Sequence, residues 1–108
     1  MYVRCQNRKL EVYFASSYIL FNNQNRTYSK SLLYKVDSGK ILSTSFTEST
    51  DDKAFFVKSP ATLMANMAKG KKKLSIKFYG NDGSQVSQFP IADLLKYRNK
   101  FASSGCKF

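Results

Sequence analysis

The sequence predicts an α+β fold: a mostly antiparallel, curved sheet, shaped like a sandwich or half-barrel, with two short helices. Residues 9–14 and 72–79 alternate apolar and polar side chains with the period of half-buried strands. Ser59 and Pro60 mark a helix start, because Ser is a preferred N-cap and Pro suits the first helical position. The length of 108 residues fits one compact core, so we expect a single domain over residues 1–108.

Strands joined by polar turns are predicted for the first half of the chain. Residues 2–5 precede the alternating stretch 9–14 across a short break, which is typical of an antiparallel hairpin. The polar stretches 22–25, 37–40 and 47–52 are interpreted as turns or loops. The strands predicted in this half cover residues 2–5, 9–14, 16–21, 31–36, 41–46 and 53–57.

The first predicted helix begins at Ser59 and Pro60 and places apolar residues at helical spacing. Lys69 is expected in its last turn, where a cation complements the helix dipole, and Gly70 is expected as its C-cap. The stripe of apolar side chains, which we expect to face the core, consists of Leu63, Met64, Met67 and Ala68.

A hairpin and a second helix are predicted for the end of the chain. Residues 72–79 and 84–89 flank the sequence Gly-Asn-Asp-Gly at 80–83, which is a strong signal for a tight hairpin turn. Pro90 is expected to open a helix over residues 91–101, whose apolar positions share one face.

The composition favours binding over catalysis. Eighteen Lys and Arg against seven Asp and Glu give a net charge of +11, which attracts polyanions or an acidic protein face. The alternative is a solvated basic surface with no dedicated partner. The chain has no His, which excludes Ser-His-Asp and Cys-His catalysis, and two Cys cannot close a structural zinc site. No phosphate-binding glycine motif is present either, so we expect a protein that is not an enzyme and needs no cofactor or metal.

The two cysteines, Cys5 and Cys106, lie near opposite ends of the chain. They are either two free thiols of a cytoplasmic protein or a disulfide that closes a loop of about 100 residues. Their placement favours the disulfide, and with it a periplasmic or secreted protein. No signal peptide opens the sequence, so this interpretation implies that the signal has been removed. The sequence also lacks an apolar run long enough to span a membrane.

Several short stretches form a pattern together: Val3-Arg4-Cys5-Gln6, residues 9–14, residues 33–40, residues 49–56, the helix after Pro60, and Cys106. This pattern resembles the VasI/TagO-like accessory proteins of bacterial type VI secretion systems. The resemblance spans nearly the whole chain and implies export, a disulfide, and an accessory role that works by contact with a secretion or envelope component.

The densest group of basic residues is the candidate surface for a polyanion or a protein partner. With an aromatic side chain beside it, such a group can bind phosphates and stack a base. The alternative is a solvated edge, because lysines also protect exposed strands from aggregation. The group consists of Lys69, Lys71, Lys72, Lys73 and Lys77, with Tyr79 as the aromatic residue. A second basic group on or after the last helix consists of Lys96, Arg98, Lys100 and Lys107.

Two functions therefore remain open from the sequence. The first is a periplasmic accessory or adaptor protein that acts by protein–protein contact, as the cysteines and the family resemblance suggest. The second is a cytoplasmic, basic module that binds nucleic acid or another polyanion, encoded for example by a phage, as the charge of +11 suggests.

Overall fold

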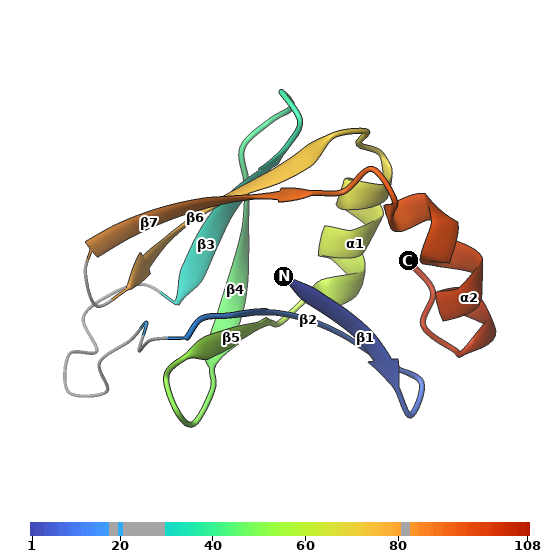
Figure 1. The fold of residues 1–108 in the computed structure, drawn as a ribbon, viewed down its shortest axis with the longest axis horizontal. Helices are drawn as coiled ribbons and strands as arrows, with labels where there is room; N and C mark the ends of the chain where they lie inside the picture. The colour runs from blue at the N-terminus through green and yellow to red at the C-terminus, as the bar shows by residue number, and fades with distance from the viewer. Residues whose placement is uncertain (18–19, 21–29, 81–82) are drawn as a thin grey trace.

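A single sheet of seven strands dominates the computed structural model, which describes residues 1–17, 20, 30–80 and 83–108. Each strand pairs antiparallel with its neighbours, and the sheet curls into a half-barrel (Figure 1). This confirms the predicted fold class. The strands are β1 (Tyr2–Gln6), β2 (Lys9–Ala15), β3 (Ser31–Val36), β4 (Leu42–Glu48), β5 (Ala54–Val57), β6 (Lys73–Gly80) and β7 (Gly83–Pro90), in the spatial order β1-β2-β5-β4-β3-β6-β7.

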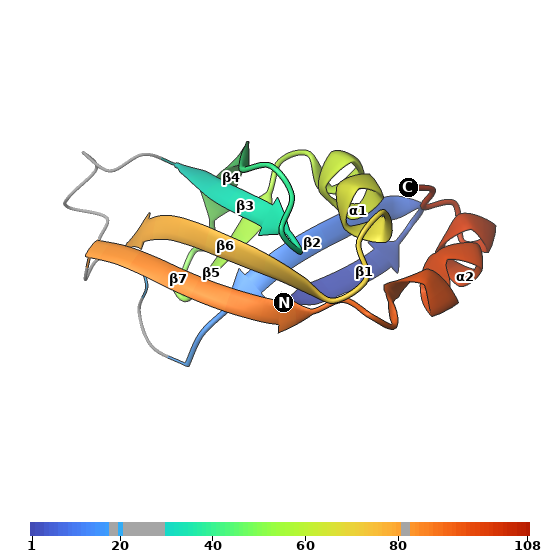
Figure 2. The ribbon, with the colours of Figure 1, turned by 90° about the horizontal axis from the view of Figure 1, so that it is seen from above.

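The half-barrel stays open between its two edge strands, β1 and β7. Helix α1 (Pro60–Ala68) lies at one end of the concave side, and the helical segment at the end of the chain lies beyond it (Figure 2). Leu63, Met64 and Met67 of the predicted stripe are buried in the core, as expected. Ala68 is only partly buried, at the end of the helix.

Aromatic rings fill the centre of the concave side. The Phe55 ring centroid lies 4.7 Å from that of Phe46, 4.8 Å from that of Phe78 and 5.1 Å from that of Phe14. Phe14 also contacts Phe89 of the edge strand β7, with the ring centroids 5.3 Å apart. Strands from opposite halves of the curled sheet therefore share one core.

The strand predicted over residues 16–21 is not found at the positions that the structure describes. Residues 18, 19 and 21 lie outside the described residues, as does the predicted loop 22–25, while Ser16, Ser17 and Leu20 are not part of a strand. The Ser16 N–H donates to the Lys53 carbonyl, and the Leu20 N–H donates to the Asp52 carbonyl. Ser16 and Leu20 therefore bond to the turn before β5 and do not form part of a further strand.

The last helix was predicted three residues too early. The Ile91 N–H donates to the Lys72 carbonyl over 3.0 Å, which extends the β6–β7 ladder beyond Pro90. This bond keeps Ile91 in the extended register of β7, one residue beyond the strand. The helical segment instead starts with a 3₁₀ turn, η1 (Leu94–Tyr97), and continues as α2 (Arg98–Ser103).

Both ends of α1 differ in detail from the prediction. Ser59 is the N-cap and Pro60 opens the helix, but the Ser59 side chain makes no capping hydrogen bond. Lys69 is the C-cap instead of a last-turn residue, and Gly70 follows it. A Cβ at Gly70 would collide with the Val36 side chain. Gly70 is therefore needed for the close approach of the chain to β3, not for a left-handed cap.

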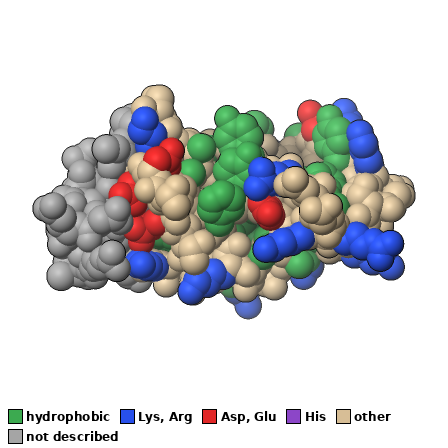
Figure 3. Space-filling view, turned by 90° about the horizontal axis from the view of Figure 1, so that it is seen from below, with side chains coloured by type: hydrophobic (Ala, Val, Ile, Leu, Met, Phe, Trp, Pro, Cys, Tyr) green, Lys and Arg blue, Asp and Glu red, His purple; other side chains and the backbone are tan. Residues whose placement is uncertain are grey.

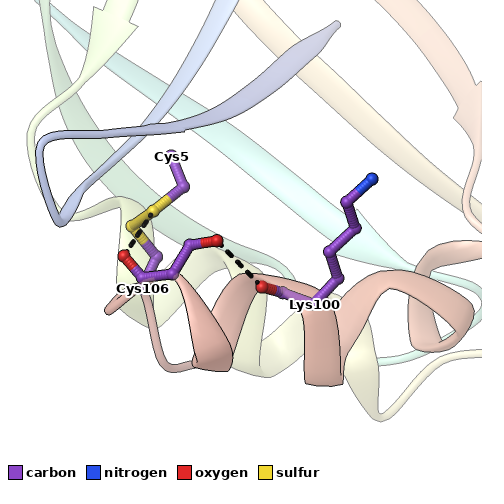
Figure 4. Close-up of a disulfide and its surroundings, with 4 residues drawn as sticks. Cys5, Lys100 and Cys106 are labelled. Atoms are coloured by element: carbon purple, nitrogen blue, oxygen red, sulfur yellow. Dashed lines mark hydrogen bonds between the residues drawn. A yellow bond between two sulfur atoms is a disulfide. The ribbon is translucent and has the colours of Figure 1, made fainter.

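A disulfide between Cys5 and Cys106 joins β1 to the tail after α2 (Figure 4). The two Cα atoms lie 6.0 Å apart, at a sequence separation of 101 residues. Gly105 has a φ of +90°, which turns the chain out of α2 and toward β1. The Ser104 hydroxyl donates to the Lys100 carbonyl and closes the end of the helix. The predicted disulfide is thus confirmed, and it indicates an oxidising compartment.

Candidate functional site

Three of the predicted surface lysines gather around one depression, which we call the basic pocket. Lys71 and Lys72 precede β6, and Lys73 is its first residue. The pocket has a volume of about 530 Å³ and lies beside the outer face of β3, β6 and β7. Its lining contains Lys35, Lys71, Lys72, Lys73, Asp37, Ser38, Ser75 and Gln88. Four lysines therefore face one carboxylate, which leaves the pocket strongly positive.

The carboxylate of Asp37 fixes the backbone of this lysine segment. It accepts backbone N–H bonds from Lys71 at 2.8 Å and from Lys72 and Lys73 at 2.9 Å. The N–H bonds, that from Lys73 foremost, hold the pKa of Asp37 below its usual value. Because these N–H groups are already satisfied, an anion in the pocket would be bound by side chains, namely the lysines together with the donors of Ser38, Ser75 and Gln88.

The other members of the predicted basic group lie apart from the pocket. Lys77 and Tyr79 point outward from β6, whereas Lys69 is the exposed C-cap of α1. Lys77 pairs with Leu33 of β3 on one side and with Val86 of β7 on the other. Leu33 is 44% exposed and Val86 67% exposed, so this part of the outer face is apolar as well as basic.

The second basic group does not extend the pocket, because none of its residues lines it; Lys96, Arg98 and Lys100 lie on the helical segment, and Lys107 follows it. Lys96 forms an ion pair with Asp93 at 3.0 Å, which raises its pKa. The Arg98 Nε donates to an oxygen of Phe108 at 2.8 Å, and its guanidinium lies over the Phe108 ring. These contacts give Lys96 and Arg98 structural partners within the chain.

A row of neighbouring aromatic rings, which we call the aromatic ladder, lies on the outer face of β1, β2 and β5 and was missed in the sequence analysis. Tyr2, Tyr13 and Phe56 lie side by side on β1, β2 and β5, with ring centroids 5.0 and 5.1 Å apart. Figure 3 shows hydrophobic side chains gathered on this face, with charged ones beside them. Arg4 lies over the Tyr13 ring at 5.3 Å and forms an ion pair with Glu11 at 2.6 Å.

One pattern in the sequence pointed to the aromatic ladder. The alternation over residues 9–14 places Tyr13 on the outward side, opposite the core residues Val12 and Phe14. The missing information was the pairing of β2 with β5, which brings Phe56 beside Tyr13.

An apolar cavity of about 400 Å³ lies where the start of β1 approaches the end of β7. Its lining includes Met1, Val3, Pro90, Ile91, Leu94 and Phe101. This cavity marks the open seam of the half-barrel.

Two kinds of feature are absent from the described residues. No group of three or more His, Cys, Asp or Glu is arranged there to hold a metal ion. None of the helices there has the length and apolar character that crossing a membrane requires.

Comparison with known proteins returned no matching family model, no matching curated protein and no matching solved structure. The similarity to the VasI/TagO-like proteins therefore rests on the short motifs quoted above and stays a prediction.

Proposed function

We propose that this protein is a non-enzymatic, extracytoplasmic accessory or adaptor protein that works by contact with another protein. The aromatic ladder with Arg4 is the observation that carries the proposal. Tyr, Phe and Arg are enriched at protein interfaces, where large rigid side chains bury area at little cost in conformational entropy. The ladder offers such side chains on an open sheet face.

The exposure of the ladder supports a role beyond stabilising the sheet. Cross-strand aromatic pairs do stabilise sheets, by about 0.2–1 kcal/mol each. Yet the Tyr2 side chain is 54% exposed, although it stacks on Tyr13. A partner that covers the ladder would bury the remaining area of these rings and desolvate the Arg4–Glu11 pair.

The disulfide supports the proposed extracytoplasmic location, because such bonds persist in oxidising compartments. Within that class we propose the periplasm, and a secretion or envelope component as the partner, on the basis of the family resemblance. A thiol count tests the location: protein denatured without reductant should show no free thiol. Two reactive thiols would favour the cytoplasmic alternative.

Site-specific photo-crosslinking tests the contact. A photoreactive phenylalanine analogue replaces Tyr2 in protein exported by its host, and the matched control carries it at Leu95, which has the same exposed fraction of 54%. We expect one discrete protein adduct from position 2, none from position 95, and loss of the adduct when Arg4→Ala is added. Equal labelling from both positions, or no adduct from either, would contradict the proposal.

The basic pocket supports a second candidate, a cytoplasmic or phage-encoded module that binds nucleic acid or another polyanion. The triple substitution of Lys71, Lys72 and Lys73 by Ala removes three charges but keeps the backbone N–H groups that bind Asp37. Binding to single-stranded DNA should weaken with salt, and the variant should lower the slope of log K against log salt by roughly 2. Lack of binding at low salt would remove this candidate.

A further inference from the structure

We propose that the free edge of β7 binds an acidic, amphipathic strand of a protein partner, which would extend the sheet by one strand. Three features define the properties of that strand. They are the free backbone groups of β7, the charges beside them, and the gap between β7 and β1. The inference rests on the proposed function only in that the partner is a protein; it concerns another surface than the aromatic ladder.

The backbone groups available at the edge follow from the strand register. Residues of an antiparallel pair alternate between hydrogen-bonded and non-hydrogen-bonded positions. The Ile91 N–H donates to the Lys72 carbonyl, which marks this position as a hydrogen-bonded one. Counting back along the register, the N–H and C=O groups of Ser84, Val86 and Gln88 point away from β6. They present six unpaired polar groups in line.

The edge lacks the features that usually prevent strand addition. Natural edge strands are shortened, bulged, charged or interrupted by proline. β7 instead has eight residues in continuous register with β6, carries no charged side chain, and has its proline only at its last position. Within the described ranges, no hydrogen bond from outside the β6–β7 ladder reaches Ser84, Val86 or Gln88. The backbone of β7 can therefore form hydrogen bonds with an added strand.

The lysines near β7 determine which side chains the outer face of the added strand carries. Lys73 and Lys77 project from the outer face of β6, directly behind β7, and Lys35 lies one strand further away. Their long side chains can cross Ser84, Val86 and Gln88 to reach a carboxylate on an added strand. A second copy of this chain would instead bring a charge of +11 against a charge of +11. The outward side chains of the occupant are therefore acidic.

The gap between β7 and β1 determines which side chains the inner face of the added strand carries. Side chains that alternate inward from an added strand would face the gap between β7 and β1. At the Pro90 end of this gap lies the apolar cavity with Met1, Val3, Ile91 and Leu94. The inward side chains of the occupant are therefore apolar, and its sequence alternates acidic and apolar residues. Strand addition of this kind takes affinity from the main chain and specificity from alternate side chains.

A synthetic peptide tests the proposal directly. The probe is an eight-residue peptide of alternating Glu and Val with blocked ends and a fluorescent label, and its control carries Lys in place of Glu. We expect fluorescence anisotropy to show saturable binding of the Glu peptide and none of the Lys peptide. Amide hydrogen exchange should show Ser84, Val86 and Gln88 unprotected in the free protein and protected in the complex, whereas Gln85 and Ser87 are protected in both.

Val86→Pro is the decisive variant. The substitution removes the Val86 N–H, which points away from β6, so the hydrogen bonds between β6 and β7 stay intact. The added strand loses one hydrogen-bond donor and clashes with the proline ring. Affinity should fall roughly tenfold or more, with Val86→Thr as the matched control that keeps it. A second variant, Lys77→Glu, should weaken binding of the Glu peptide without touching the edge backbone.

Several results would overturn the inference. They are binding that survives Val86→Pro, edge amides that stay unprotected in the complex, and equal binding of the Lys peptide. Edge amides that become protected with protein concentration, together with a dimer in sedimentation, would assign the edge to a second copy. None of these results bears on the photo-crosslink at Tyr2, so the proposed function and this inference can fail separately.

Discussion

Removal of the disulfide is the perturbation with the most direct physical consequence. Cys5→Ala together with Cys106→Ala opens a loop whose ends are 101 residues apart in the sequence. In the chain-entropy model, closing such a loop lowers the entropy of the unfolded chain by about 16 cal/mol/K, which is about 4.7 kcal/mol at 25 °C. Small domains have free energies of unfolding of about 5–15 kcal/mol, so the loss is a large share of the total.

Urea denaturation followed by far-UV circular dichroism measures this loss. With an m-value of about 1.5 kcal/mol/M, the midpoint should fall by roughly 3 M. Each single substitution should cost nearly as much as the double one, because either removes the cross-link completely. Wild-type protein kept reduced should match the double variant. A loss below about 1 kcal/mol, or single losses that add up to the double, would refute the assignment of stability to this cross-link.

Three further outcomes are expected. Gly105→Ala should lower the free energy of unfolding by about 1–2 kcal/mol, since its φ of +90° disfavours a Cβ, and thermal unfolding should show a lower Tm; an unchanged Tm would argue against this turn. Phe55→Ala should cost about 3–5 kcal/mol in urea denaturation, because its ring contacts three other phenylalanines; a loss near zero would contradict the packing. Asp37→Asn should lower the urea midpoint at pH 7. Because the folded pKa of Asp37 is lowered, its contribution is present above the unfolded pKa of about 4 and is lost as the pH falls through the lower folded value. The two proteins should therefore converge in acid, and a constant gap would show that the charge is not the cause.

The fold class could be predicted because the strands in question carry strict patterns. Leu74, Ile76 and Phe78 alternate with polar residues, and the structure buries all three. The helix at Pro60 was recognised because local chemistry decides a helix start. Residues 91–93 were misassigned because a long-range bond, from Ile91 to Lys72, overrides the local signal of Pro90.

The surfaces could be predicted only in part, for a related reason. Lys71, Lys72 and Lys73 are consecutive in the sequence, so their proximity needs no knowledge of the fold. Lys35 and Asp37 enter the same pocket through the pairing of β3 with β6, which no local pattern reveals. The aromatic ladder likewise depends on pairing across the sheet, because Tyr13 and Phe56 are far apart along the chain.

The position of the two cysteines also has a consequence for biosynthesis. Cys106 is made 101 residues after Cys5, so in the exported protein that we propose, the bond cannot form until nearly the whole domain has reached the oxidising side. Oxidation would follow arrival of the whole segment there. Fragments cut short before Cys106 would keep an unpaired thiol, a chemical mark by which quality control could tell them from finished molecules.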